Sequence, residues 1–344
     1  MGIQLKDLML KKEIDLNYLE GKTVAVDAYN IIYQFLSSIR QYDGTPLMDS
    51  NDNITSHLSG LFYRNINFLE GGIKPIYVFD GKPPNFKTTT LDERKERKIS
   101  AKEKMDTALK KGFFEDAKKY SQQTSRLTKE MVEEGKELLE AMGIPVVQAP
   151  SEGEAQASCM AKEGIAYGVV SQDADCLLFG APRLIRNLSV TGKRKIPGKN
   201  IYASISPEII ELKEMLDSLQ INREQLILIG ILIGTDFNNG IKGVGSKTAL
   251  KIVKENDDLD KIIALVEKKY DYVFEENPYK IQEFFLNPPL TKEYEIKFKS
   301  PDKEKIFKIL NEKHDFEETR IENALARLSK NIETKVKQKG LFEF

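Results

Sequence analysis

The chain has 344 residues, of which 40% are hydrophobic and 31% are charged, which is enough to bury a large core in one or two domains. Its 52 basic and 53 acidic residues leave a net charge of −1, which excludes a uniformly basic nucleic-acid binder but not a local basic surface. The two cysteines are too few for a disulfide framework and indicate a reducing, intracellular compartment. The longest apolar run, 226–234, is too short to span a bilayer, so we expect a soluble protein with no membrane contact.

The N-terminal part of the chain predicts two strands that each end in an aspartate. Short runs of β-branched and aromatic residues at 23–27 and 75–80 are closed by Asp27 and Asp80. Helices with apolar residues at helical spacing are predicted at 28–40 and 54–71. Strands alternating with helices in this way indicate βαβ units in a parallel sheet.

Two stretches depart from this pattern through their charge. Residues 87–119 are dense in charge and poor in apolar side chains, so they predict a helical excursion that buries little surface. A plain solvated helix face explains that composition equally well. Residues 176–207 hold six basic residues and no acidic ones, and a Thr-Gly pair within them predicts a hairpin between strands at 183–190 and 193–203.

The segment 148–180 places two acidic pairs, Glu152/Glu154 and Asp173/Asp175, around a short apolar run. That run, 167–171, predicts a buried strand. Like charges a few Å apart oppose one another's ionisation, so we infer that divalent cations lie between the pairs. A helix at 131–142 and a strand at 144–147 are predicted before this segment.

The C-terminal half predicts mostly helices, beginning with 208–219 and 224–234. Asp236 follows the second of these directly. The glycine-rich stretch 240–245 then leads into a helix at 246–255, which completes a helix–hairpin–helix unit. The last residues, 334–344, predict an extended tail.

Acidic residues recur at the ends of these predicted elements: Asp27, Asp80, Glu152, Glu154, Asp173, Asp175 and Asp236. Ligands of open α/β sheets bind outside the carboxyl ends of the strands, which is where most of these residues lie. Singly, each has a structural explanation, such as a capping box from Ser151 to Glu154 or Asx turns at Asp173 and Asp175. The recurrence at one rim of the sheet instead indicates a shared site.

Oxygen ligands alone suit Mg²⁺ or Mn²⁺. Zinc is disfavoured because the chain has only His57 and His314, which we expect to be structural. So many carboxylates indicate two ions about 3.5–4 Å apart, an arrangement that catalyses phosphoryl displacement. The predicted substrate is therefore a phosphate ester.

The glycine-rich stretch contains residues that could contact phosphate: Gly240, Lys242, Gly243, Gly245 and Lys247. A nucleotide-binding P-loop is disfavoured, because a serine separates the last glycine from the lysine and a helix precedes the stretch. A turn that opens a helix offers backbone N–H groups to a phosphodiester, which predicts binding of a nucleic-acid backbone without base readout. A simple helix–helix turn is the structural alternative.

Six segments carry a resemblance to a known family: VDAYNIIYQFL (26–36), TSHLSGLFYR (55–64), KPIYVFDGKPP (74–84), GIPVVQAPSEGEAQA (143–157), SQDADCLLFG (171–180) and GILIGTDFNNGIKGVGSKTAL (230–250). In this order they resemble the flap endonucleases of archaea and eukaryotes. The resemblance implies an α/β fold with a mostly parallel central sheet flanked by helices, a PIN-like 5′ nuclease core, a helical arch and a helix-two-turn-helix region. It implies a single core over 1–330, with an N-terminal part at 1–84, the arch at about 85–130, an internal part at about 131–255 including the hairpin unit at 226–255, and a clamp-binding tail at 331–344.

The resemblance also assigns roles to residues. The seven acidic residues match the family's ligands for two Mg²⁺ ions, which Mn²⁺ can replace, with Asp27, Asp80, Glu152 and Glu154 nearer one ion and the other three nearer the second. Lys87 and Arg94 match basic residues at the base of the arch that stabilise charge on the scissile phosphate, and Tyr33 matches an aromatic that stacks on a neighbouring base. Gly2 resembles a buried N-terminal glycine near the active site. In the family, the hairpin at 240–245 binds the downstream duplex, commonly with a K⁺ ion.

The C-terminal residues Gln338, Leu341 and Phe344 resemble a PCNA-interacting box, although that box normally ends in two aromatics and this chain has one. The function implied is a 5′ flap endonuclease with 5′–3′ exonuclease activity that hydrolyses DNA phosphodiesters by a two-metal-ion mechanism. It acts in Okazaki-fragment maturation and long-patch base excision repair. Its implied setting is the archaeal cytoplasm or the eukaryotic nucleus, as a monomer bound to branched DNA with a 5′ flap and to the sliding clamp PCNA. The alternative is a non-catalytic DNA-junction-binding or clamp-adaptor protein on a nuclease-like scaffold.

Overall fold

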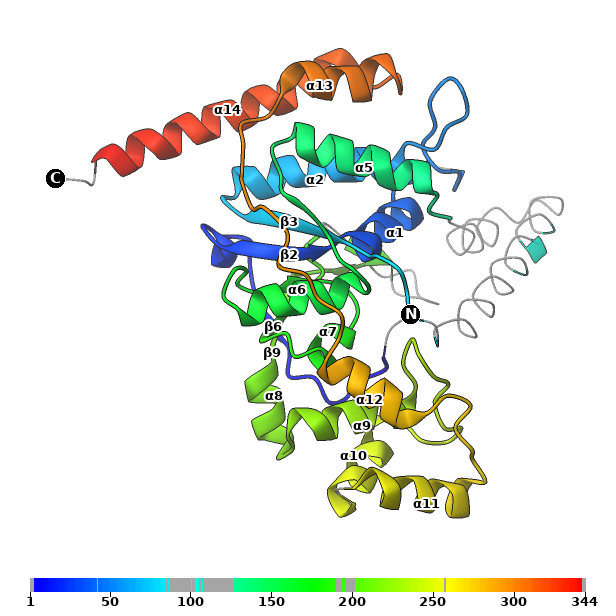
Figure 1. Cartoon of the computed structure of the whole chain (residues 1–344). Coiled ribbons are helices and arrows are strands. Elements are labelled where there is room, and N and C mark those ends of the chain that lie inside the picture. The colour runs from blue at the N-terminus through cyan, green and yellow to red at the C-terminus, as the bar shows by residue number, and fades with distance from the viewer. Residues whose placement is uncertain are drawn as a thin grey trace.

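The computed structural model describes residues 3–41, 43–84, 86, 100, 103–104, 107, 126–189, 193–195, 202–256 and 258–341. Within them a mixed sheet of seven strands crosses the middle of the molecule (Figure 1). In spatial order these strands are β1 (Lys12–Glu13), β9 (Glu208–Glu211), β6 (Arg183–Arg186), β5 (Val169–Val170), β2 (Thr23–Asp27), β3 (Lys74–Phe79) and β4 (Val146–Gln148). The five strands from β6 to β4 run parallel, and β9 is antiparallel to both β6 and β1. The prediction of a mostly parallel sheet is therefore confirmed.

The sheet is covered on both faces. Along β2, Val24 and Val26 belong to one hydrophobic cluster and Ala25 to the other, as expected for a parallel strand buried on both sides. In Figure 1, α1 (Ala28–Ser38), α2 (Ser56–Glu70) and α5 (Lys129–Ala141) lie above the sheet. On the lower side lie α6 (Gly153–Lys162), α7 (Asp175–Leu178) and α9 (Arg223–Ile233). The carboxyl ends of the central strands are thus left as the edge at which a site can form.

Helices gather at the lower end of the molecule in Figure 1: α8 (Leu212–Leu219), α10 (Ser246–Glu255), α11 (Leu259–Tyr270) and α12 (Pro278–Leu286). The chain then returns across the molecule to α13 (Lys303–Phe307), the π-helical turn η3 (Lys308–Glu312) and α14 (Glu318–Leu341). Two shorter features complete the described elements, the 3₁₀ turn η1 (Asn17–Leu19) and the pair β7 (Lys193–Lys195) with β8 (Tyr202–Ser204). None of the described helices combines the length and apolar character that a membrane span requires.

Gly143 lets the returning chain dock against the core. Its φ is +75°, and a Cβ there would lie 2.0 Å from the carbonyl oxygen of Lys299. The Lys299 N–H donates to the Gly143 carbonyl at 3.0 Å, and the Asp302 N–H donates to the Ala141 carbonyl at 2.7 Å. Only glycine accommodates both the left-handed backbone and this close approach.

Three predictions about the C-terminal half are wrong. The strands at 183–190 and 193–203 do not form a hairpin, because β6 pairs with β5 and β9 while β7 pairs with β8. The predicted helix at 208–219 begins as strand β9, since the buried Ile209 and Ile210 complete the sheet. The tail is helical to Leu341 rather than extended, because extending an existing helix avoids the cost of nucleating a new one.

Both histidines lie in one buried network that joins the C-terminal segment to the core. His314 Nδ1 lies 2.8 Å from Asp49 Oδ2, and its Nε2 lies 3.3 Å from Glu134 Oε1. His57 is fully buried, and neither of its ring nitrogens has a hydrogen-bond partner in the described structure. Its nearest charged neighbour is Glu134, with Nε2 and Oε2 3.9 Å apart. The expectation that both histidines are structural agrees with these contacts.

We expect His57 to make the protein acid-sensitive. Burial lowers its pKa to about 4, although the Glu134 carboxylate favours the charged form. The unfolded chain takes up this proton near the ordinary pKa of 6.5. The contribution of the neutral His57 to the free energy of unfolding is therefore complete above pH 6.5 and is lost as pH falls towards 4. The loss should be about 3 kcal/mol in the free energy of unfolding.

Urea unfolding at pH 7 and pH 4.5 measures this loss. His57→Leu removes the titrating group and should flatten the pH dependence in that window. Asp217→Asn, an exposed site on α8, serves as the control that should not. An unchanged acid sensitivity in His57→Leu would show that other groups cause it.

Candidate active site

Asp27 ends β2 and caps α1. Its Oδ1 accepts the Asn30 N–H at 3.1 Å, and its Oδ2 accepts the Ser171 hydroxyl at 3.0 Å. The side chain is 4% exposed. A β-branched strand that stops at a capping residue therefore aims this carboxylate at the carboxyl edge of the sheet.

Asp80, Glu152 and Glu154 meet at the start of α6. Asp80 follows β3, and its Oδ1 accepts the Gly153 N–H at 2.7 Å. Glu152 is the N-cap residue of α6, and Glu154 lies in its first turn. The predicted capping box from Ser151 is not formed, because the helix begins one residue later and no side chain caps it. The orphan N–H of Gly153 is satisfied by Asp80 instead, which ties β3 to this helix.

The remaining three carboxylates come from other elements. Asp173 follows β5, and its N–H donates to the Ser171 hydroxyl oxygen at 3.1 Å. Asp175 is the first residue of α7 and is 2% exposed. Asp236 follows α9 after the C-cap Gly234. Strands and helices distant in sequence thus bring their acidic ends to one region.

Five of these carboxylates interact through their charges. Burial raises the pKa of Glu154 well above its ordinary value, and the negative charges of Asp173, Asp175, Asp27 and Asp236 raise it further. Burial also raises the pKa of Asp27 to about 6, against the N–H of Asn30 and the hydroxyl of Ser171. Five of the seven predicted acidic residues therefore share one field, in which full ionisation is unfavourable without positive charge.

The donor set fits hard divalent cations. It consists of carboxylate oxygens, and the one thiol in their field, that of the buried Cys176, has its pKa raised by burial and by Glu154, so it stays protonated and is a poor ligand. Within the described part of the chain, no three Asp, Glu, His or Cys side chains form a ready-made chelate. Mg²⁺ keeps several of its waters and takes only one or two direct carboxylates, so an open ring of acids suits it.

The hairpin between α9 and α10 has the form that the sequence predicts. Ile241 and Val244 are buried, at 3% and 7% exposure. The residues between and after them are exposed: Lys242, Gly243, Gly245 and Lys247. A Cβ on Gly243 or Gly245 would meet nothing within 4 Å. Lys242 is thus accessible on an exposed turn, and Lys247 is accessible in the first turn of α10.

For the other predicted site residues the structure gives the element on which they lie but few contacts. Tyr33 is half-buried on α1, one turn after Tyr29, and the charge of Asp80 acts on Tyr29. Gln338 and Leu341 belong to α14. Gly2, Lys87, Arg94 and Phe344 lie outside the described residues.

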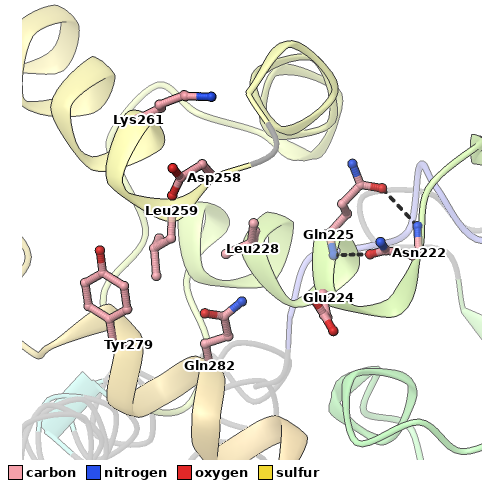
Figure 2. Close-up of a pocket in the computed structure, with 9 residues that line it drawn as sticks. All are labelled: Asn222, Glu224, Gln225, Leu228, Asp258, Leu259, Lys261, Tyr279 and Gln282. Atoms are coloured by element: carbon pink, nitrogen blue, oxygen red, sulfur yellow. Dashed lines mark hydrogen bonds between the residues drawn. The ribbon is translucent and has the colours of Figure 1, made fainter.

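A cleft of about 480 Å³ at the lower end of the molecule lies apart from these residues (Figure 2). It is formed by α9, α11 and α12 and is lined by Asn222, Glu224, Gln225, Leu228, Asp258, Leu259, Lys261, Tyr279 and Gln282. Its polar groups are largely engaged within the protein. Asn222 and Gln225 form a capping box, and the Tyr279 hydroxyl donates to Asp260. None of the seven acidic residues lines it, so the cleft and the carboxylate site are separate.

Comparison with known proteins identifies the family. The model of the XPG N-terminal domain matches residues 1–101, and that of the XPG I-region matches 143–236. A flap endonuclease 1 of Thermococcus onnurineus is 55% identical over 333 residues, with 96% of each chain covered. One of Pyrococcus furiosus is 54% identical over 335 residues, covering 97% of this chain and 96% of the other. The chain belongs to the flap endonuclease 1 family.

Solved structures agree with this membership. Flap endonuclease-1 from Methanococcus jannaschii is 44% identical and covers 97% of this chain and 100% of its own, with a TM-score of 0.76. The catalytic core of Rad2 covers 95% of this chain with a TM-score of 0.69 at 24% identity, which shows a shared fold. The PIN-like nuclease core expected from the resemblance is confirmed for this flap endonuclease.

The sequence did not single out three residues that hold the acidic side chains. They are Asn30, Gly153 and Ser171. Gly153 and Ser171 lie within the motifs around the acidic pairs, and Asn30 lies in the segment after Asp27. Their proximity to acidic residues was the available signal, but their partners are set by the fold.

Proposed function

We propose that this chain is a structure-specific 5′ flap endonuclease with 5′–3′ exonuclease activity, which hydrolyses DNA phosphodiesters at flap junctions with two Mg²⁺ ions. Its roles are Okazaki-fragment maturation and long-patch base excision repair. The observation that supports this best is the field at Glu154, where carboxylates from four other places in the chain raise one pKa. A cluster so unfavourable in itself is typical of functional sites.

The residues divide the chemistry among them. The seven carboxylates would hold the ions, with Asp27, Asp80, Glu152 and Glu154 around one and Asp173, Asp175 and Asp236 around the other. When bound, such ions stabilise charge on the attacking and leaving oxygens of a phosphodiester. We assign to Lys87 and Arg94 the stabilisation of charge on the scissile phosphate, and to Tyr33 the stacking of a neighbouring base.

We assign DNA positioning to the exposed hairpin. The N–H groups after Gly240 and the ammonium groups of Lys242 and Lys247 would bind duplex phosphates. A K⁺ ion would bind at the same turn. Gly2 is assigned separately, to a place near the active site. Contacts of this kind make binding independent of sequence and steeply dependent on salt. Branched DNA with a 5′ flap is the proposed substrate.

The C-terminal tail is the proposed site for the sliding clamp PCNA, through Gln338, Leu341 and Phe344. Because α14 continues to Leu341, clamp binding would require these residues to act from a helix end or to leave it. We propose that the protein works as a monomer on DNA, in the cytoplasm of an archaeal cell.

Cleavage of a labelled double-flap DNA tests the proposed function. We expect cleavage at the flap junction with Mg²⁺ or Mn²⁺ and none with EDTA, and a product with a 5′-phosphate and a 3′-hydroxyl. A blunt duplex without a flap is the matched control for structure specificity. Tight flap binding with no cleavage under either ion would favour a non-catalytic junction-binding protein.

A further inference from the structure

Ser171 lies at the centre of the acidic cluster although it carries no charge. It follows β5 directly and is 0% exposed. Its hydroxyl lies 3.0 Å from Asp27 Oδ2 and 3.4 Å from Glu154 Oε1, and its oxygen accepts the Asp173 N–H at 3.1 Å. One hydroxyl therefore contacts three of the acidic residues, two through their side chains and one through its backbone.

The bonding capacity of a hydroxyl makes this arrangement directional. A serine has one proton to donate and two lone pairs to accept with. The N–H of Asp173 occupies the acceptor side, so the proton points to the carboxylates of Asp27 and Glu154, which share it. A donor polarised by an N–H behind it donates more strongly. The uncharged hydroxyl of Ser171 thus connects the side chains of Asp27 and Glu154.

The backbone around Ser171 fixes the place of this hydroxyl. The Ser171 N–H donates to the Ile185 carbonyl on β6 at 3.2 Å. The next residue, Gln172, donates its N–H to Asn30 Oδ1 at 3.0 Å, and the Asn30 N–H in turn donates to Asp27 at 3.1 Å. Because the residue is held on both sides, its hydroxyl imposes a position on the carboxylates rather than following them.

We propose that Ser171 is a positioning residue that sets the spacing of Asp27 and Glu154 and aligns Asp173 with them for divalent cations. The proposal rests on the proposed function of the carboxylate cluster. Without the hydroxyl, the buried Asp27 and the part-buried Glu154 lose their shared donor, and only the direct hydrogen bond between the two side chains is left to set their spacing. The cluster then has to be rearranged when the cations bind, which weakens their binding.

Binding of Mn²⁺ alone, followed by electron paramagnetic resonance without DNA, tests this role. Supporting residues of metal ligands typically contribute about 10–100-fold to metal affinity, and we expect a loss in that range for Ser171→Ala. Ser171→Thr keeps the hydroxyl and should restore the affinity. Ser189→Ala is the matched control, because Ser189 is 3% exposed and its hydroxyl binds Gln34 Oε1 at 2.6 Å, outside the cluster. Its Mn²⁺ affinity should equal that of the wild type.

Thermal unfolding of each variant without metal separates positioning from folding. Wild-type Mn²⁺ affinity in a folded Ser171→Ala protein would overturn the proposal, as would equal losses in folded Ser171→Ala and Ser171→Thr. If Ser171→Ala does not unfold cooperatively, Ser171→Cys replaces it, since a thiol donates weakly in the same place. Wild-type affinity in that variant would also overturn the proposal. Flap cleavage is scored separately, so that a wild type that binds Mn²⁺ without cutting contradicts the proposed function and leaves the positioning role intact.

Discussion

Asp175→Ala should abolish cleavage of flap DNA while leaving binding of that DNA nearly unchanged. Asp175 is 2% exposed and its charge acts on Glu154 across the cluster, so its removal would take away one of the ligands proposed for the second cation. A bound metal supplies several kcal/mol of charge stabilisation in the transition state, which corresponds to a loss of about 10³-fold or more in the cleavage rate. Duplex binding, which we assign to the hairpin after α9, should persist.

Single-turnover cleavage and binding of a labelled double flap measure the two effects separately. Asp217→Ala, at an exposed site on α8, is the control and should cut at the wild-type rate. Equal cutting by Asp175→Ala and the wild type would remove this residue from the metal site. A parallel loss of affinity and rate would mean that the substitution disrupts DNA binding rather than the chemical step.

The acidic residues stand at the boundaries of regular elements, which local sequence patterns mark: Asp27 ends a strand, Glu152 and Asp175 stand at helix starts, and Asp236 follows a helix. Parallel strands bring their carboxyl ends to one edge, so Asp27 after β2 and Asp80 after β3 had to be neighbours once the strands were recognised. The buried strands were recognised by their β-branched residues. The helix α1 was recognised by its apolar spacing, α2 by the turns before it, and α5 by the glycine that closes it. In each case local sequence and tertiary packing favour the same structure.

The errors arose where long-range pairing decides the structure. The sequence of β9, Glu-Ile-Ile-Glu, suits a helix as well as a strand, and it is a strand because β6 and β1 flank it. Ser171 was not singled out, because its partners Asp27 and Glu154 are 144 and 17 residues away. A serine after a strand is ordinary until the fold brings two carboxylates to its hydroxyl.

Glu154→Gln should stabilise the metal-free protein although it removes an acid that we propose as a ligand of the catalytic cations. Burial and four neighbouring carboxylates raise the pKa of Glu154, so the folded state holds this proton more tightly than the unfolded chain. A raised carboxyl pKa contributes stability at low pH that is lost as pH rises through the folded-state value. At pH 7.5 Glu154 therefore destabilises the fold in either protonation state, and a neutral amide of the same shape removes that cost. We expect a gain of about 1 kcal/mol in the free energy of unfolding, within the range for relief of strained functional sites.

Mg²⁺ should reverse this order of stability. A ligand that binds only the folded state at 100 times its dissociation constant adds about 2.7 kcal/mol, and the wild type should gain more from Mg²⁺ than Glu154→Gln does. Urea unfolding at pH 7.5 with and without Mg²⁺ measures both gains, with Glu137→Gln on the exposed side of α5 as the control. A metal-free Glu154→Gln protein less stable than the wild type would mean that the bond from Ser171 outweighs the repulsion. The predicted reversal follows if the cluster is held together by the cations it binds, because the same charges that destabilise the empty site then provide the affinity for them.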